Sequence, residues 1–82
     1  MWYVYFLKLS NDDIYVGSTG DLRGRLSTHR NGEVRSTKAH RPVKLKSYVA
    51  VETELLARQL ERYFKSGSGK AVALKRFMDQ DR

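Results

Sequence analysis

Five side chains of this sequence could together hydrolyse a phosphodiester bond. They are, in chain order, Tyr5, Tyr15, Arg25, His29 and Glu61. Tyrosine and histidine can move a proton, arginine can neutralise charge on a reacting phosphate, and one carboxylate with bound water suits Mg²⁺. Each residue type also has an ordinary structural reading. Strand aromatics usually pack in a core, a helical Arg–His pair can face solvent, and a helical glutamate can pair with a lysine.

The charge of the chain favours nucleic acid as its partner. Sixteen Lys and Arg against nine Asp and Glu give a net charge of +7 in 82 residues. A field of this size attracts polyanions. No segment joins a basic face to a broad apolar one, so a membrane surface is a weaker alternative.

Two sets of basic residues are expected to contact backbone phosphates. Lys65 and Lys70 flank residues 66–69, a serine- and glycine-rich segment that reads first as a helix-breaking turn. Such a turn could also hold one phosphate at the start of the next helix. The remaining expected contacts crowd one predicted loop and the strand that follows it: Arg35, Lys38, His40, Arg41, Lys44 and Lys46.

Length and composition predict a single domain over residues 1–82. Hydrophobic residues make up 40% of the chain, enough for one compact core, and the chain is too short for a second. The absence of cysteine excludes disulfides and thiolate metal sites, and fits a cytoplasmic location. The apolar N-terminus has no basic leader and no run of about 18 apolar residues, so neither a signal peptide nor a membrane span is expected.

The periodicity of apolar residues predicts an α+β fold in the order ββαβαα. Alternating aromatic and β-branched residues are typical of strands, and apolar residues three and four apart are typical of helices. We therefore expect a small three-stranded antiparallel sheet flanked by helices, with a polar, basic loop over residues 33–43. Strands are expected over residues 2–9, 14–18 and 44–51, and helices over residues 22–30, 54–65 and 70–79.

Local signals define the helix ends and the buried faces. Asp21 and Thr53 are suited to cap the first two helices, and residues 31–32 to end the first. Residues 10–13 are typical of a turn with left-handed backbone. In the first strand, Trp2, Val4 and Phe6 share one face and Tyr3, Tyr5 and Leu7 the other. Alternation assigns one face of the third strand to Leu45, Ser47, Val49 and Val51, and spacing assigns the buried stripe of the second helix to Leu56, Leu60, Tyr63 and Phe64.

Whether Tyr5 and Tyr15 share a face of the sheet depends on the turn between their strands. A loop of two or four residues would place them on opposite faces, and a loop of three or five would place them together. The sequence leaves both possibilities open. Arg25 and His29 lie four apart, so they project from one side of their helix, at the border of its apolar stripe.

In combination, these residues resemble the GIY-YIG nucleases. Tyr3-Val4-Tyr5 and, after nine intervening residues, Tyr15-Val16-Gly17 look like the paired tripeptide signature of that family. Arg25 and His29 stand where the family carries its helix arginine and its histidine or tyrosine, and Glu61 fits its metal-binding glutamate. The similarity spans nearly the whole chain, and in particular resembles small stand-alone bacterial members related to the N-terminal nuclease domain of excision-repair endonucleases.

The chain departs from the family pattern at several positions. Tyr3 replaces the first glycine, and Val4 and Val16 replace isoleucines with little change in volume. Many members carry a late asparagine near the metal, whereas Asn11 and Asn31 are the only asparagines of this chain. One supporting role is therefore unfilled.

The resemblance implies a metal-dependent endonuclease, with DNA favoured over RNA and with structure-directed cutting in repair or recombination. One Mg²⁺ or Mn²⁺ would be held by Glu61 and waters, and Tyr5 or Tyr15 would act as the general base. Arg25 would neutralise charge on the phosphorane, and His29 would orient a tyrosine or the water. A protein partner could supply targeting. The alternatives are a non-catalytic nucleic-acid-binding module on the same scaffold, in which Glu61 would not matter, and a protein-interaction adaptor.

Overall fold

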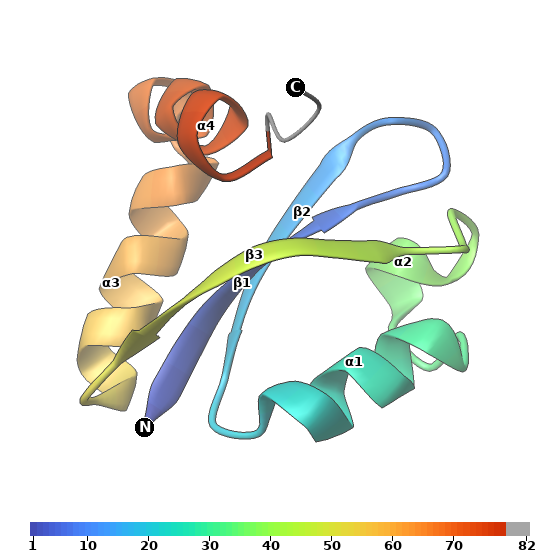
Figure 1. The fold of residues 1–82 in the computed structure, drawn as a ribbon, viewed down its shortest axis with the longest axis horizontal. Helices are drawn as coiled ribbons and strands as arrows, with labels where there is room; N and C mark the ends of the chain where they lie inside the picture. The colour runs from blue at the N-terminus through green and yellow to red at the C-terminus, as the bar shows by residue number, and fades with distance from the viewer. Residues whose placement is uncertain (79–82) are drawn as a thin grey trace.

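The computed structural model describes residues 1–78, which form an antiparallel sheet with helices on both faces (Figure 1). The strands are β1 (Trp2–Lys8), β2 (Ile14–Thr19) and β3 (Lys44–Val51). The helices are α1 (Leu22–Arg30), α2 (Arg35–Lys38), α3 (Glu54–Lys65) and α4 (Gly67–Ala73), and a π-helical turn, η1 (Leu74–Met78), follows α4. The strand order is β2-β1-β3, so β1 is central. Figure 1 shows α1 and α2 on one side of the sheet and α3 and α4 on the other.

The expected α+β class and the order ββαβαα are confirmed. Both predicted caps are present: the Asp21 carboxylate accepts the Gly24 N–H at 3.1 Å, and the Thr53 hydroxyl accepts the Leu56 N–H at 3.1 Å. Gly32 follows α1 with φ +76°, a left-handed conformation that ends a helix. No helix within residues 1–78 is long and apolar enough to cross a membrane.

The central strand is covered on both faces. Val4 and Phe6 pack against Phe64 under α3, while Tyr5 and Leu7 pack on the opposite face against α1. All four of these β1 side chains are fully buried. The predicted division of the strand into two faces is therefore confirmed, and each face has its own apolar cluster.

The hairpin between β1 and β2 decides the position of the two tyrosines. Residues 9–13 form a five-residue loop between the last paired positions of the strands. Tyr5 pairs with Gly17, and Leu7 pairs with Tyr15. Since Tyr5 and Leu7 project from the same face of β1, Tyr15 lies on that face too. Of the two classes left open by the sequence, the one with three or five loop residues is present.

A β-bulge makes the predicted face of β3 wrong for one residue. Phe6 pairs with Ser47 but Leu7 pairs with Leu45, which leaves Lys46 as an extra residue in β3. The extra residue reverses the alternation. Leu45 consequently packs with the Tyr5 cluster, whereas Val49 and Val51 pack with the Phe6 cluster.

Two further expectations about the helices are wrong. The polar loop predicted over residues 33–43 contains the one-turn helix α2, which is too short to show apolar periodicity in the sequence. The predicted break over residues 66–69 is confined to Ser66, whose hydroxyl accepts the Gly69 N–H at 3.2 Å and caps α4. The last helix thus begins three residues earlier than expected, and its expected end at Asp79 lies outside the described residues.

The predicted buried stripe of α3 is also too wide. Ala57 and Phe64 are buried, but Leu56 and Tyr63 are 42% and 44% exposed. Within residues 1–78, the sheet against which α3 packs has three strands, and a narrow stripe of α3 covers it.

We predict that Gly69→Ala destabilises the fold while Gly67→Ala does not. A Cβ at Gly69 would overlap the carbonyl of Tyr63 at the end of α3, whereas a Cβ at Gly67 would meet nothing within 4 Å. Overpacking of this kind costs about 1–3 kcal/mol, and alanine is favoured over glycine in a helix. Urea unfolding of both variants measures the difference. Equal stability of the two variants would contradict the close approach of α4 to α3.

Candidate active site

A buried chain of hydrogen bonds joins β1, α1 and α2. The Tyr5 hydroxyl lies 2.9 Å from Nε2 of His29, and Nδ1 of His29 lies 2.8 Å from the Thr37 hydroxyl. The Thr37 hydroxyl in turn donates to the Val34 carbonyl at 3.5 Å. Tyr5, His29 and Thr37 are all fully buried. The chain links three elements that are separate in the sequence.

The hydrogen bond from Thr37 to Val34 favours one tautomer of His29. Because the Thr37 hydroxyl donates to Val34, its oxygen accepts the N–H at Nδ1 of His29. Nε2 then carries a lone pair and accepts the Tyr5 O–H. Burial lowers the pKa of His29, and the positive charge of Arg25 lowers it further. A neutral imidazole with a free lone pair directed at a phenol can take its proton.

Tyr5 is a neutral phenol next to a cation. Burial raises the pKa of Tyr5, the hydrogen bond from Arg25 lowers it in part, and the charges of Tyr15 and Glu61 add to the rise. Nε of Arg25 lies 3.4 Å from the Tyr5 hydroxyl. Arg25 itself is exposed, so its guanidinium can contact both the buried tyrosine and a bound phosphate. The sequence expectation placed both Arg25 and His29 at the border of α1, but His29 lies inside.

Gly17 provides the space in which the Tyr5 hydroxyl lies. A Cβ at this position would overlap that hydroxyl. Gly17 pairs with Tyr5, and β2 is an edge strand, so the Tyr5 hydroxyl lies over an edge strand of the sheet. Gly17 is part of the paired tripeptide signature seen in the sequence. The sequence did not predict that this glycine makes room for the Tyr5 hydroxyl.

Tyr15 completes the aromatic group on this face. Its ring centroid lies 6.2 Å from that of Tyr5 and 5.1 Å from that of His29. Nζ of Lys65 lies 5.9 Å from the centroid of the Tyr15 ring. Lys65 belongs to α3, on the other side of the sheet, so Tyr15 lies where the two sides meet.

Glu61 reaches the same edge from the opposite face. Its carboxylate accepts the Ser18 hydroxyl at 2.6 Å and the Lys65 ammonium at 2.8 Å, and 22% of its side chain is exposed. Burial raises the pKa of Glu61, but the hydrogen bonds from Lys65 and Ser18 outweigh it, so the pKa is lowered overall. Glu61 is therefore a charged, largely shielded carboxylate, and its ordinary structural reading as the partner of a helical lysine is met by Lys65 as well.

The donor set fits a hard divalent cation held mainly by water and phosphate. Within residues 1–78, no group of three or more His, Cys, Asp or Glu side chains gathers as a metal cage. Mg²⁺ is commonly bound through one or two carboxylates, several waters and the phosphates of its substrate. Glu61 is ionised and partly accessible, so it could supply the one protein oxygen of such a site.

The basic residues predicted to bind nucleic acid fall into two groups. Lys65 and Lys70 line a hollow of about 170 Å³ beside Tyr15. Arg58 and Arg62, which sequence analysis missed, line a second hollow of about 220 Å³ with Glu61 and Lys65. Their signal was helical spacing, since Arg58, Glu61, Arg62 and Lys65 follow one another at i, i+3, i+4 and i+7 on one face of α3.

The second group lies around α2 and the start of β3. Its members are Arg35, Lys38, His40, Arg41, Lys44 and Lys46. The Arg41 guanidinium donates to the carbonyls of Lys38 at 3.0 Å and Arg30 at 3.4 Å, so part of its capacity stabilises the loop. Figure 1 shows α2 and α4 on opposite sides of the sheet, which separates this group from Lys70.

Comparison with known proteins identifies a family. The family model described as the GIY-YIG catalytic domain matches residues 1–75. A UPF0213 protein of Bacillus pumilus is 39% identical over 69 residues, which cover 83% of this chain and 70% of the relative. A UPF0213 protein of Streptococcus agalactiae is 36% identical over 70 residues, covering 84% of this chain and 80% of the relative.

A third relative, a UPF0213 protein of Bacillus velezensis, is 39% identical over 64 residues that cover 77% of this chain. The matched segment spans 65% of that relative's length. The names of these relatives state no activity. No solved structure matches the chain significantly.

We predict that Gly17→Ala displaces Tyr5 and destabilises the protein by about 1–3 kcal/mol. The added Cβ would overlap the Tyr5 hydroxyl and break its hydrogen bond to His29. In a Tyr5→Phe background, the same change should cost less, because the hydroxyl is gone. Urea unfolding of the wild type, Gly17→Ala, Tyr5→Phe and the double variant completes the cycle and provides the test. Strictly additive costs would mean that Gly17 and Tyr5 are not in contact.

We predict that the free energy of unfolding falls as the pH drops from about 7 to 5.5. The folded pKa of His29 is lowered, so the unfolded chain binds more protons as the pH falls below about 6.5. The stability due to a neutral His29 is therefore present above this pH and is lost below it. In His29→Gln, the slope over this window should be smaller. Parallel pH profiles of the two proteins in chemical denaturation would rule out the lowered pKa.

Proposed function

This chain belongs to the GIY-YIG family, and we propose that it is a divalent-metal-dependent endonuclease that hydrolyses phosphodiester bonds of nucleic acid. DNA is favoured over RNA, and cutting is directed by the structure of the substrate, as in repair or recombination. The observation that carries the proposal is the hydrogen bond from Tyr5 to a buried, neutral His29, with Arg25 beside the phenol. A phenol hydrogen-bonded to a neutral imidazole can accept a proton from water while it gives its own proton to the imidazole. The reverse transfer then restores both groups.

The proton path follows the hydrogen-bonded chain. The attacking water would give a proton to the Tyr5 oxygen while the phenol proton moves to Nε2 of His29. The water oxygen would bond to phosphorus, and the bond from phosphorus to the oxygen of the leaving strand would break. Thr37 keeps the proton at Nδ1 in place throughout. Because the pKa of Tyr5 is raised, the phenol is neutral before the attack, and its own proton would pass to His29 as the proton of the water arrives. Tyr15, beside both residues, would orient the water, although it could serve as the base itself.

Arg25 would stabilise the charge that develops on the phosphorane. It is exposed toward solvent and within 3.4 Å of the Tyr5 hydroxyl, so a phosphate placed for attack would lie near its guanidinium. Preorganised cations at developing charge are commonly the largest single contribution to catalysis.

Glu61 would hold one Mg²⁺ or Mn²⁺ together with waters. When bound, the cation would polarise the scissile phosphate and stabilise the leaving oxygen. Lys65 now donates to the Glu61 carboxylate at 2.8 Å, and we propose that this ammonium turns to a substrate phosphate when the carboxylate is engaged. Ser18 keeps the carboxylate oriented from β2.

The basic groups would hold the strands on either side of the cut. Lys65 and Lys70 lie at the edge strand beside Tyr15, where they would contact the scissile strand. The second group would contact more distant phosphates: Arg35, Lys38, His40, Arg41, Lys44 and Lys46. Such contacts give affinity that falls steeply with salt and carries little sequence preference.

We predict that Glu61→Gln lowers the rate of DNA cleavage at least about 100-fold, because the charged ligand of the cation is lost. Glu54→Gln is the matched control, since Glu54 forms the same kind of ion pair with Arg58 on the same helix, at 2.8 Å. Labelled duplex, single-stranded and branched DNA, and RNA, would be incubated with Mg²⁺ or Mn²⁺ and with a chelator.

Metal-dependent cutting by the wild type and by Glu54→Gln, lost in Glu61→Gln, is the expected result. Equal rates for the two variants would remove Glu61 from the mechanism. Binding without cutting on every substrate would favour the non-catalytic nucleic-acid-binding module instead.

A further inference from the structure

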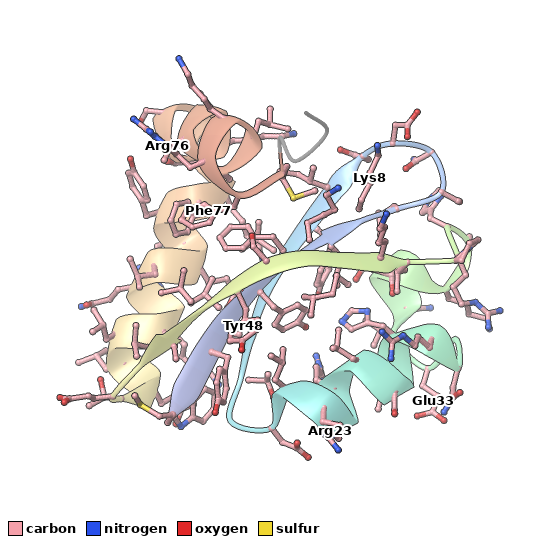
Figure 2. The ribbon with its side chains drawn as sticks, in the orientation of Figure 1. Lys8, Arg23, Glu33, Tyr48, Arg76 and Phe77 are labelled. Atoms are coloured by element: carbon pink, nitrogen blue, oxygen red, sulfur yellow. The ribbon has the colours of Figure 1, made fainter. Side chains whose placement is uncertain are left out.

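A groove of about 500 Å³ lies between α1 and the β1–β3 part of the sheet. Its lining includes two tyrosines of the sheet and two arginines of α1: Tyr3, Tyr48, Arg23 and Arg30. In Figure 2, the labelled Tyr48 lies on β3 and the labelled Arg23 on α1. The proposed catalytic mechanism uses none of these four residues.

The groove presents an aromatic surface. The rings of Tyr3 and Tyr48 meet edge to face, with centroids 5.9 Å apart and planes at 71°. Tyr48 is 52% exposed, although it lies in the middle of a strand and pairs with the fully buried Tyr5. A ring that is held at its edge by a second ring and open on its surface is suited to stack against a nucleobase.

The groove is also cationic. Arg23 and Arg30 are seven residues apart on α1, about 10 Å along the helix axis, and both are exposed. Within residues 1–78, neither forms an ion pair with a carboxylate. The one acidic lining residue, Asp21, directs its carboxylate to the Gly24 N–H at the start of α1. Two free guanidiniums beside an aromatic ring match a ligand that has both phosphates and bases.

The position of the groove relates it to the catalytic residues. Arg25 and His29 project from α1 toward Tyr5 and the β2 edge, whereas Arg23, Ser27 and Arg30 line the groove on the β3 side. The two sites therefore lie on opposite flanks of one helix, separated by about 10 Å, the width of a helix with its side chains.

We propose that this groove binds an unpaired segment of the substrate strand, with one base stacked on Tyr48 and adjacent phosphates paired with Arg23 and Arg30. The proposal extends the proposed endonuclease function, since it makes a junction between duplex and single strand the preferred substrate. A continuous duplex does not fit, because its bases are stacked on one another and offer no free face to Tyr48.

Binding of a labelled oligothymidylate to the full chain tests the groove without cleavage. Fluorescence anisotropy in the presence of chelator would compare Tyr48→Leu and Arg23→Gln with two matched controls outside the groove, Tyr63→Leu and Arg76→Gln. Tyr63 is similarly exposed, at 44%, and Arg76 is an exposed arginine of η1. Tyr48→Phe keeps the ring, and thermal unfolding confirms that each variant is folded.

We expect Tyr48→Leu to weaken oligothymidylate binding about fivefold or more, with Tyr48→Phe close to wild type and the controls within twofold. Binding of a blunt duplex should change less than twofold in Tyr48→Leu. Equal losses in Tyr48→Leu and Tyr63→Leu, or no loss in either, would overturn the proposal.

A cleavage assay separates this proposal from the proposed function. If the wild type cuts DNA but Tyr48→Leu retains the wild-type preference for a splayed duplex over a blunt one, the groove proposal fails and the nuclease stands. If the wild type cuts nothing yet Tyr48 is required for oligothymidylate binding, the nuclease fails and the groove remains a single-strand site.

Discussion

Tyr5 and His29 bring two polar groups into the fully buried interior of a very small protein. A buried donor or acceptor without a partner costs about 1–3 kcal/mol, so the hydroxyl and the imidazole constrain everything around them. Their hydrogen bond fixes α1 against β1, and the second nitrogen of His29 fixes Thr37 and with it the single turn of α2. The proposed proton path and the packing of three elements thus depend on the same contact.

The edge strand β2 explains how two separate faces of a sheet can build one site. Tyr5, Tyr15 and His29 lie on the α1 side, whereas Ser18 and Glu61 meet on the α3 side. A central strand would keep these groups apart, because neighbouring strands would cover both of its edges. At an edge, the thickness of one strand separates them, and Gly17 leaves room for the Tyr5 hydroxyl over that strand on the α1 side.

Much of the fold could be predicted from the sequence, because local rules of side-chain chemistry and periodicity govern it. The hairpin, the caps at Asp21 and Thr53 and the two faces of β1 follow from alternation and side-chain chemistry. What could not be read depends on contacts between distant residues. The bulge at Lys46, the turn of α2 and the link from Glu61 to Ser18 have no local signature, and neither does the groove beside Tyr48, where two residues of a strand pair meet one side of a helix.

The edge of β2 has a consequence for the association of one copy of the protein with another. An uncovered strand edge is a template onto which another copy of the chain can add a strand, and lysines nearby are a common defence. Lys65 and Lys70 lie beside this edge in a chain with a net charge of +7. The charges that would gather phosphate therefore also keep neighbouring molecules apart. Conditions that screen these charges would weaken both effects together, because both would have one electrostatic origin.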